Sequence, residues 1–321
     1  MVQALVVLLS LGLAELIARI VQLGQAGGVL CLASLATVVV CARLGWQQAM
    51  AGVAGLALLT VPAVFSNSDP QLATIVLTVA AIGLGLSVRW QMKPVFWLLM
   101  VSLCILITNS PLPAAPSGLE AIRLALALLA AGGVAALLQS LLVPHAPRPA
   151  TAVANSWRRS TAHAGMLAAA TLVSTPIALE HHWHTTGLWL ILTPFLVLQP
   201  FVRESWTVAV HRCLGTLAGV LLVIAVGLLV PRGIPLELPA IAAGVLTVVI
   251  AARHGHRALM LTAFTATIVL FNSSHEDLLL MADQRVLASA LGIAIALSAM
   301  ALALPIERHF ARARRSIGPG A

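Results

Sequence analysis

Charged residues are scarce in this chain, and their scarcity excludes most classes of soluble protein. Only 9% of its 321 residues are charged and 60% are hydrophobic, which gives a mean hydropathy of +1.02. A soluble domain carries about a quarter of charged residues. The composition therefore predicts an all-α, polytopic membrane protein. Tyrosine is absent, so no phenol can take part in binding or catalysis.

Cysteines are few, and several common enzyme motifs are absent from the sequence. The chain has four cysteines, and all of them lie in apolar runs without a C-x-x-C pair: Cys31, Cys41, Cys104 and Cys213. We interpret them as small buried side chains and not as disulfides or metal ligands. No G-x-S-x-G, H-E-x-x-H or Walker A motif is present. We expect no enzymatic activity, no cofactor and no ATP-driven transport by this chain alone.

Long apolar runs fill most of the sequence. A membrane-spanning helix needs about 17 to 25 residues. Runs of about this length fall at 2–22, 27–43, 46–65, 71–88, 94–110, 119–143, 160–179, 185–201, 206–230, 235–252, 258–272 and 284–305. The pattern predicts about 12 transmembrane helices.

The basic residues are distributed unevenly between alternate loops. The loops after even-numbered runs and the C-terminal tail hold most of the lysines and arginines: Arg43, Arg89, Lys93, Arg148, Arg158, Arg159, Arg203, Arg212, Arg253, Arg257, Arg308, Arg312, Arg314 and Arg315. Cytoplasmic loops are enriched in such residues. We therefore expect a multi-pass membrane protein with both termini in the cytoplasm. The net charge of +8 reflects this topology and does not indicate a nucleic-acid partner.

Two halves of the chain repeat each other at their rare charged positions. Arg43 matches Arg203, and Arg123 matches Arg285, at offsets of 160 and 162 residues. We predict two parallel six-helix repeats. The expected segments are a degenerate repeat at 1–145, a cytoplasmic linker at 146–157, the second repeat at 158–307 and a basic cytoplasmic tail at 308–321.

The stretch from Trp189 to Gly219 has the most distinctive pattern. An apolar helix is expected to break at Gln199-Pro200 and to restart at Ser205. Arg212 then lies inside an apolar helix, where a charge is costly in lipid and should face protein or water. Small residues follow, and they allow another helix to approach closely: Gly215, Thr216 and Gly219.

Other basic residues could gather anions at the cytoplasmic face. Arg89 and Lys93 are four residues apart, as are Arg253 and Arg257, so each pair shares one helix face. With Arg203 they could line a basic vestibule, or they could be ordinary positive-inside anchors. Both interpretations stay open.

On the opposite side, two acid–arginine pairs occupy the starts of the sixth and twelfth apolar runs. Glu120 with Arg123, and Asp283 with Arg285, are expected to form structural salt bridges. Asp283 and Glu120 are alternatively candidates for proton coupling, because carboxylates near a pathway can relay protons.

Histidines and tryptophans carry weaker signals. The loop with His181, His182 and His184 is a poor metal-binding pattern, and we expect an interfacial loop and no metal site. Four tryptophans lie near predicted helix ends: Trp157, Trp183, Trp189 and Trp206. We expect an interfacial aromatic belt, with stacking on a substrate as the alternative.

Taken together, L-Q-P at 198–200 followed by R-x-x-G-T-x-x-G from Arg212 resembles the fusaric-acid-resistance-like (FUSC) proteins, which include the aromatic acid exporters. The resemblance extends over about 158–308, and the first half lacks both motifs. It implies an inner-membrane exporter of aromatic or other weak organic acids, driven by the proton gradient and working with a periplasmic adaptor protein.

The residues themselves indicate which groups would bind the substrate. Arg212 and the break at Pro200 would bind a carboxylate, with the other residues of the motif and of the basic face as further substrate-binding candidates: Arg203, Gln199, Trp189, Gly215, Thr216, Arg253, Arg257, Arg89 and Lys93. The expected partners are a small organic anion and the lipid bilayer, and a homodimer is left open. A passive organic-anion channel and a non-transporting scaffold of an envelope complex are the alternative functions.

Overall fold

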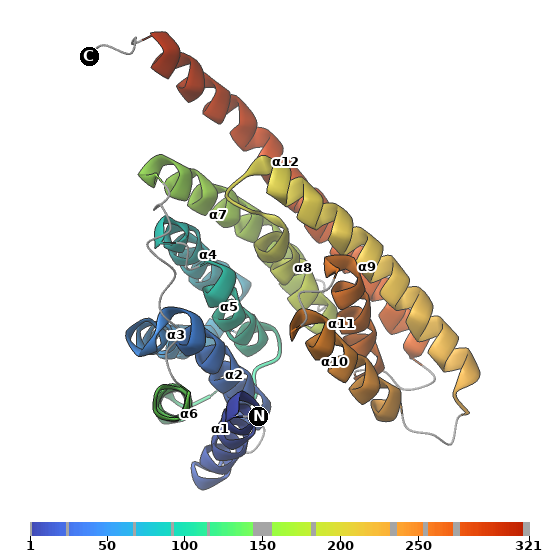
Figure 1. Cartoon of the computed structure of the whole chain (residues 1–321). Coiled ribbons are helices and arrows are strands. Elements are labelled where there is room, and N and C mark those ends of the chain that lie inside the picture. Colours follow the sequence, from blue (N-terminus) through green and yellow to red (C-terminus); the bar gives the residue numbers. More distant parts are fainter. Residues whose placement is uncertain are drawn as a thin grey trace. The chain divides into compact units, whose positions relative to one another are not determined.

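The protein is built from helices. The computed structural model describes residues 2–23, 26–66, 69–90, 93–113, 116–143, 156–180, 184–231, 236–252, 256–271 and 277–316. Within these ranges every regular element is helical and no strand occurs (Figure 1). The all-α class predicted from composition is therefore confirmed.

The chain divides into two compact units, Met1–Leu188 and Trp189–Ala321. The division falls inside a helix and not at the linker 146–157, because the helix after that linker packs on helices of the first unit. The repeat bounds 1–145 and 158–307 come from the similarity between the two halves of the sequence, and they stay a prediction.

The first unit contains seven complete helices and one short 3-10 helix among its described residues. They are α1 (Val2–Ile20), α2 (Gly27–Leu44), α3 (Trp46–Phe65), α4 (Pro70–Leu86), η3 (Ser87–Trp90), α5 (Lys93–Thr108), α6 (Gly118–Leu142) and α7 (Trp157–Glu180). α6 packs on α1, α2 and α3, and α7 packs on α4. Gly45 separates α2 from α3 with φ of 95°, a backbone conformation that side chains disfavour.

The second unit begins within α8 (His184–Val197) and continues with α9 (Val202–Leu229), α10 (Glu237–Ala252), α11 (Arg257–Phe271) and α12 (Leu278–Ser316). α9 packs on α11 and α12, and α10 packs on α11. α12 is longer than the expected run 284–305, and it extends as a helix into the basic tail.

Polar residues at helix starts explain where two helices begin. The Asp69 carboxylate accepts hydrogen bonds from the backbone N–H of Gln71 and Leu72 at 2.9 and 3.2 Å, with Pro70 in the first helical position. Ser117 and Glu120 form a reciprocal capping box at the start of α6. Such caps satisfy backbone N–H groups that have no partner within the helix.

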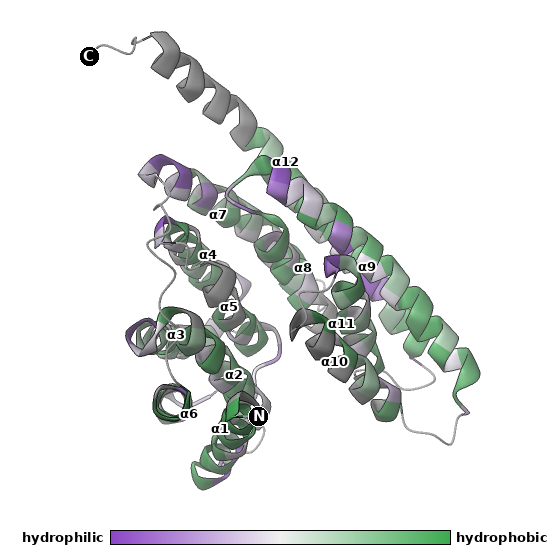
Figure 2. Cartoon of the chain, in the orientation of Figure 1, coloured by the Kyte–Doolittle hydropathy of each residue, from purple (hydrophilic) through white to green (hydrophobic). Residues whose placement is uncertain are grey.

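Six described helices are long and apolar enough to cross a membrane. They include α3, α6, α7, α9, α4 together with η3, and α12 to Leu302. Shorter apolar helices cover Gly27–Ala42, Leu99–Thr108 and Gly187–Val197. Hydrophobic residues cover most of the helix surfaces, and hydrophilic ones gather at places such as the start of α7 (Figure 2). The protein is therefore a multi-pass membrane protein, and the twelve-helix arrangement in two repeats stays a prediction.

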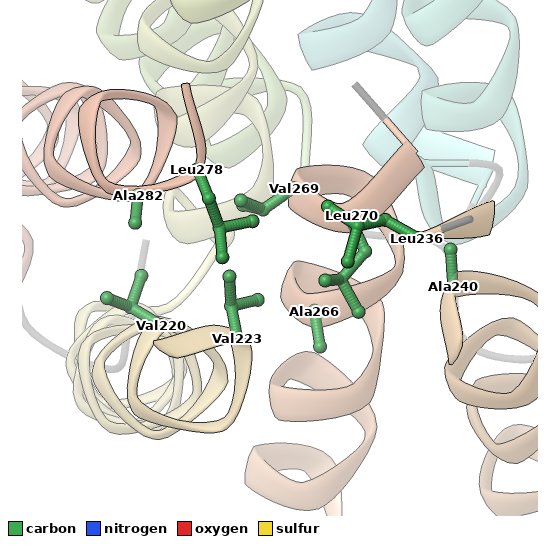
Figure 3. Close-up of a cluster of buried hydrophobic side chains, with 9 residues drawn as sticks. All are labelled: Val220, Val223, Leu236, Ala240, Ala266, Val269, Leu270, Leu278 and Ala282. Atoms are coloured by element: carbon green, nitrogen blue, oxygen red, sulfur yellow. The ribbon is translucent and has the colours of Figure 1, made fainter. Parts of the chain in front are cut away.

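A cluster of apolar side chains lies between helices of the second unit (Figure 3). Val220 and Val223 of α9 meet residues of α11 and α12, among them Val269 and Leu278. With Ala240 of α10, the cluster joins α9, α10, α11 and α12.

The glycines of the R-x-x-G-T-x-x-G motif lie where α11 crosses α9. A Cβ added at Gly215 would lie 2.6 Å from Leu261 Cβ. One added at Gly219 would lie 2.7 Å from Thr265 Cβ and 2.8 Å from the Thr262 carbonyl oxygen. The predicted close approach of a helix at these positions is confirmed, and the helix is α11.

We expect Gly219→Val to lower the free energy of unfolding by about 1–3 kcal/mol or more, the usual cost of forcing extra carbon atoms into a packed contact. The backbone carbonyl at Thr262 cannot move aside as a side-chain end could. The thermal unfolding midpoint of the detergent-purified protein measures the effect. Gly165→Val is the matched control, because a Cβ at Gly165 meets nothing within 4 Å; equal midpoints for both variants would contradict the prediction.

Candidate functional site

The break between α8 and α9 is held by one serine. α8 ends at Val197 and α9 begins at Val202, so the break predicted at Gln199-Pro200 is confirmed and the restart comes earlier than Ser205. The Ser205 hydroxyl accepts a hydrogen bond from the Gln199 backbone N–H at 2.8 Å and lies 3.2 Å from the carbonyl oxygens of Gln199 and Phe201. The Gln199 side chain donates back to the Leu196 carbonyl oxygen at 2.8 Å. Gln199 and Pro200 thus shape the turn.

Arg212 is buried inside α9, with 2% of its surface exposed. Its Nε and Nη2 donate to the Thr193 hydroxyl of α8 at 3.3 and 3.2 Å. That hydroxyl in turn donates to the Trp189 carbonyl oxygen at 2.7 Å. A neutral oxygen receives both bonds, so the positive charge of Arg212 has no counter-charge there.

Arg285 of α12 is buried as well, with 3% of its surface exposed. Its guanidinium carbon lies 3.5 Å from the centre of the Trp189 ring, a stacked cation–π contact. None of its three guanidinium nitrogens has a hydrogen-bond partner among the residues that the structure describes. Buried polar groups in proteins almost always have partners, so Arg285 is an exception that needs an explanation.

Further donors without acceptors lie close in sequence to Arg285 and Trp189. The indole Nε1 of Trp189 is buried and has no hydrogen-bond partner within the described ranges, and the same holds for the hydroxyl of Ser289, one helical turn after Arg285. The Trp189 ring also meets Phe264 of α11 edge to face, with ring centres 5.8 Å apart. The site is therefore rich in N–H and O–H donors, and what it lacks is an acceptor.

α12 approaches α8 closely beside these donors. A Cβ added at Gly292 would lie 2.5 Å from Thr193 Cβ and 3.2 Å from the Leu190 carbonyl oxygen. Pro194 cannot donate a hydrogen bond to that carbonyl, so the Leu190 carbonyl does not receive its usual bond from within α8. Arg285, Ser289 and Gly292 follow at spacings of four and three residues, which place them on one face of α12. That face carries the contacts with Trp189 and Thr193.

Electrostatically, the site is a buried region of positive charge. Arg212 contacts Thr193 and Arg285 contacts Trp189, one turn apart on α8, and the two guanidinium groups are near enough for their like charges to repel. No carboxylate among the described residues forms a salt bridge with either arginine. Burying an uncompensated charge costs several kcal/mol, so this arrangement is suited to a bound anion.

The two predicted acid–arginine pairs are not formed. Asp283 is exposed while Arg285 is buried, because residues two apart on a helix point to different faces. Glu120 accepts bonds from the backbone and hydroxyl of Ser117 at 2.7 and 2.9 Å, so its carboxylate caps α6 and does not form the salt bridge expected with Arg123. Arg123, the repeat counterpart of Arg285, is exposed.

Two of the remaining predicted substrate-binding residues are not buried as Arg212 is. Arg203 and Arg257 are exposed at the starts of α9 and α11. Arg89 of η3 lies over the Trp157 ring, 5.5 Å from its centre. Gly215 and Thr216 are buried on α9, where the glycine faces α11. Arg253 and the side chain of Lys93 lie outside the described residues.

Trp189 differs from the other tryptophans. Trp157 and Trp206 are exposed near helix starts, as an interfacial belt requires. Trp189 is buried within the arginine site, so the belt assignment is wrong for it. His181, His182 and Trp183, together with the side chain of His184, lie outside the described residues, and among the residues that are described no cluster of metal-ligating side chains occurs.

Sequence reasoning named Trp189 and Arg212 but assigned Arg285 to a salt bridge. The spacing of Arg285, Ser289 and Gly292 along one helix face is the signal that could have placed Arg285 in the bundle interior. The equivalent residue of the first repeat, Arg123, did not indicate this burial, because Arg123 is exposed and only Arg285 is buried.

Residues 163–299 match the model of the family described as fusaric acid resistance protein-like. The matched range contains every residue of the arginine site, from Trp189 to Gly292. Comparison with curated proteins and with solved structures found no match. The family match and the apolar helices support a role in membrane transport or efflux. Residues 163–299 of this membrane protein are thus similar to the fusaric acid resistance protein-like family, as the sequence motif predicts.

Proposed function

We propose that this protein is a carrier for organic anions and that Arg212 and Arg285 bind the anion between α8, α9 and α12. The observation that carries the proposal is the buried guanidinium of Arg285, whose three nitrogens have no partner. A carboxylate accepts two parallel N–H bonds from such a group. It would supply both the missing acceptor and the missing negative charge.

The aromatic side chains favour an anion with a ring. Trp189 presents one face to Arg285 and meets Phe264 at 5.8 Å. Displacing Arg285 slightly along the Trp189 face would let an aromatic carboxylate stack there while the guanidinium holds its acid group. This supports aromatic or other weak organic acids as the transported class.

The proposal includes export from the cytoplasm across a bacterial inner membrane, driven by the proton gradient. It also includes twelve membrane-crossing helices in two parallel repeats, with both termini cytoplasmic, and assistance by a periplasmic adaptor protein. The distribution of Lys and Arg between alternate loops supports the topology. Asp283, two residues before Arg285, is the coupling candidate that we retain, because the carboxylate of Glu120 already caps α6.

Uptake of labelled benzoate-type and aliphatic carboxylates into inside-out vesicles tests the function. We expect accumulation against a concentration gradient when the vesicle interior is acidic, and we expect a protonophore to abolish it. Asp283→Asn should then lose gradient-driven accumulation while retaining exchange of internal for external anion. Vesicles without the protein give the background from passive diffusion of the neutral acids.

The other outcomes have distinct meanings. Equilibration of the acids that does not depend on the pH gradient would identify a passive organic-anion channel and would overturn the proposed coupling to the proton gradient. No protein-dependent movement, with no binding of any carboxylate to the purified protein, would overturn the transport proposal and favour a scaffold in an envelope complex.

A further inference from the structure

The first unit contains an open pocket that lies outside the matched region. It has a volume of about 420 Å³ and lies between α3, α4 and α5. Gly55 of α3 and Gly83 of α4 line it together with Leu56, Leu84, Met100 and Leu103. Its size falls within the range of about 300–1,000 Å³ typical of small-ligand pockets.

The glycines create the space. A Cβ added at Gly55 or Gly83 would meet nothing within 4 Å, in contrast to Gly215 and Gly219 at a helix contact. Ser87 is the one polar side chain among the described lining residues, and its hydroxyl already donates to the Leu84 carbonyl oxygen at 2.6 Å. The described lining residues therefore offer nothing that could hold a charged or strongly polar solute.

The mouth of the pocket opens among apolar side chains. Val79, on the pocket lining, is 54% exposed, and Ile75 and Ile82 are exposed on the same helix. An exposed apolar surface on a membrane-spanning helix faces hydrocarbon. The species that can enter such a pocket from hydrocarbon is an acyl chain.

A basic and aromatic cluster lies at one end of the pocket. Ser87 is the first residue of η3, and Arg89 lies two residues further, with its guanidinium carbon 5.5 Å from the centre of the Trp157 ring. Trp90 meets the same ring edge to face at 5.8 Å. Trp157 begins α7, and the exposed Arg158 and Arg159 follow it.

This end of the pocket belongs to the side that the loop charges identify as cytoplasmic. Tryptophans settle at the headgroup level, and the cytoplasmic leaflet contains the anionic lipids of a membrane. The pocket runs along α4 from Val79 to Ser87, about 12 Å at 1.5 Å per residue. That length lies within one leaflet, which is about 15 Å of hydrocarbon.

We propose that the α3–α4–α5 pocket binds one acyl chain of an anionic phospholipid of the cytoplasmic leaflet, with the phosphate at the cluster of Arg89 and Trp157. The chain supplies the apolar volume that the glycines leave open, and the phosphate complements Arg89, Arg158 and Arg159. A neutral phospholipid has the same chain but no net charge for the cluster, so the site should prefer the anionic lipid.

Cross-linking with photoactivatable lipids tests the site. The full-length protein is reconstituted in bilayers that contain phosphatidylglycerol or phosphatidylcholine with a diazirine on the acyl chain, and the labelled peptides are mapped by mass spectrometry. We expect label on α3, α4 and α5 around the pocket, with more from phosphatidylglycerol. Gly83→Leu, which fills the pocket, should lower that label by about tenfold, which corresponds to about 1.4 kcal/mol.

Gly165→Leu is the matched control, since a Cβ at Gly165 of α7 also meets nothing within 4 Å and Gly165 is not among the described residues that line the pocket. It should leave the label unchanged. Arg89→Gln should keep the label in the pocket and reduce the preference for phosphatidylglycerol by about fivefold, the factor expected for one basic residue at an anionic surface. Arg19→Gln is its control, because Arg19 pairs with Glu15 on α1 at 3.1 Å.

Two results would overturn the proposal. Equal labelling of wild type, Gly83→Leu and Gly165→Leu would show that lipid contacts the surface without entering the pocket. Pocket labelling with no difference between the two lipids, in wild type and in Arg89→Gln alike, would refute the anionic headgroup contact.

Discussion

Replacing Arg285 with methionine should abolish anion transport and at the same time stabilise the protein. Arg285 is buried with three unpartnered nitrogens, and an apolar side chain of similar length removes that uncompensated charge. Replacing buried charged groups with apolar ones raises stability by about 1–4 kcal/mol in favourable cases, and methionine can keep contact with the Trp189 ring. Losing the guanidinium should weaken anion binding by about 2–5 kcal/mol, or about 30-fold and more.

The two effects are measured on the same purified protein. The unfolding midpoint in detergent should rise, and uptake of labelled carboxylate into vesicles should fall to background. Arg123→Met is the matched control, because Arg123 occupies the equivalent repeat position but is exposed, and surface changes usually alter stability by less than about 0.5 kcal/mol. A stable variant that still transports at the wild-type rate would remove Arg285 from the site.

Arg212→Ala should also abolish transport, while the protein remains folded and inserted. Among the described residues, Arg212 bonds only with the Thr193 hydroxyl, and that hydroxyl has its own bond to the Trp189 carbonyl oxygen at 2.7 Å, which does not depend on the arginine. The loss of hydrogen bonds is therefore small. The functional loss is large, because a second positive charge no longer stabilises the bound anion.

Ligand-dependent stability separates binding from transport for this residue. A carboxylate that binds the folded protein raises the free energy of unfolding, by about 2.7 kcal/mol at a hundred times its dissociation constant. The unfolding midpoint rises with it. We expect that rise for wild type and for Arg203→Ala, whose side chain is exposed at the start of α9, and no rise for Arg212→Ala. An unchanged rise in Arg212→Ala would place the anion elsewhere.

Much of the local structure follows from short-range rules. The expected runs agree with the helices from α1 to α11 within a few residues, because apolar length and Gly, Pro or Asn breaks act locally. Gln199-Pro200 ends α8 since proline lacks the N–H that a helix interior needs. The close approach at Gly215 and Gly219 follows from the absence of side chains there. The membrane class follows from composition alone.

The pairing of charged residues depended on the tertiary structure. Asp283 and Arg285 are close in sequence and of opposite charge, yet the helix directs them to different faces, and the packing of α12 on α8 buries only the arginine. The sequence predicted Trp189 as part of the interfacial aromatic belt, but in the structure its ring contacts Arg285 and Phe264. The sequence by itself determined the membrane class, most helix ranges and the small-residue contacts, since these depend on local composition. The tertiary structure decided which charges are buried, because burial depends on which helices pack together.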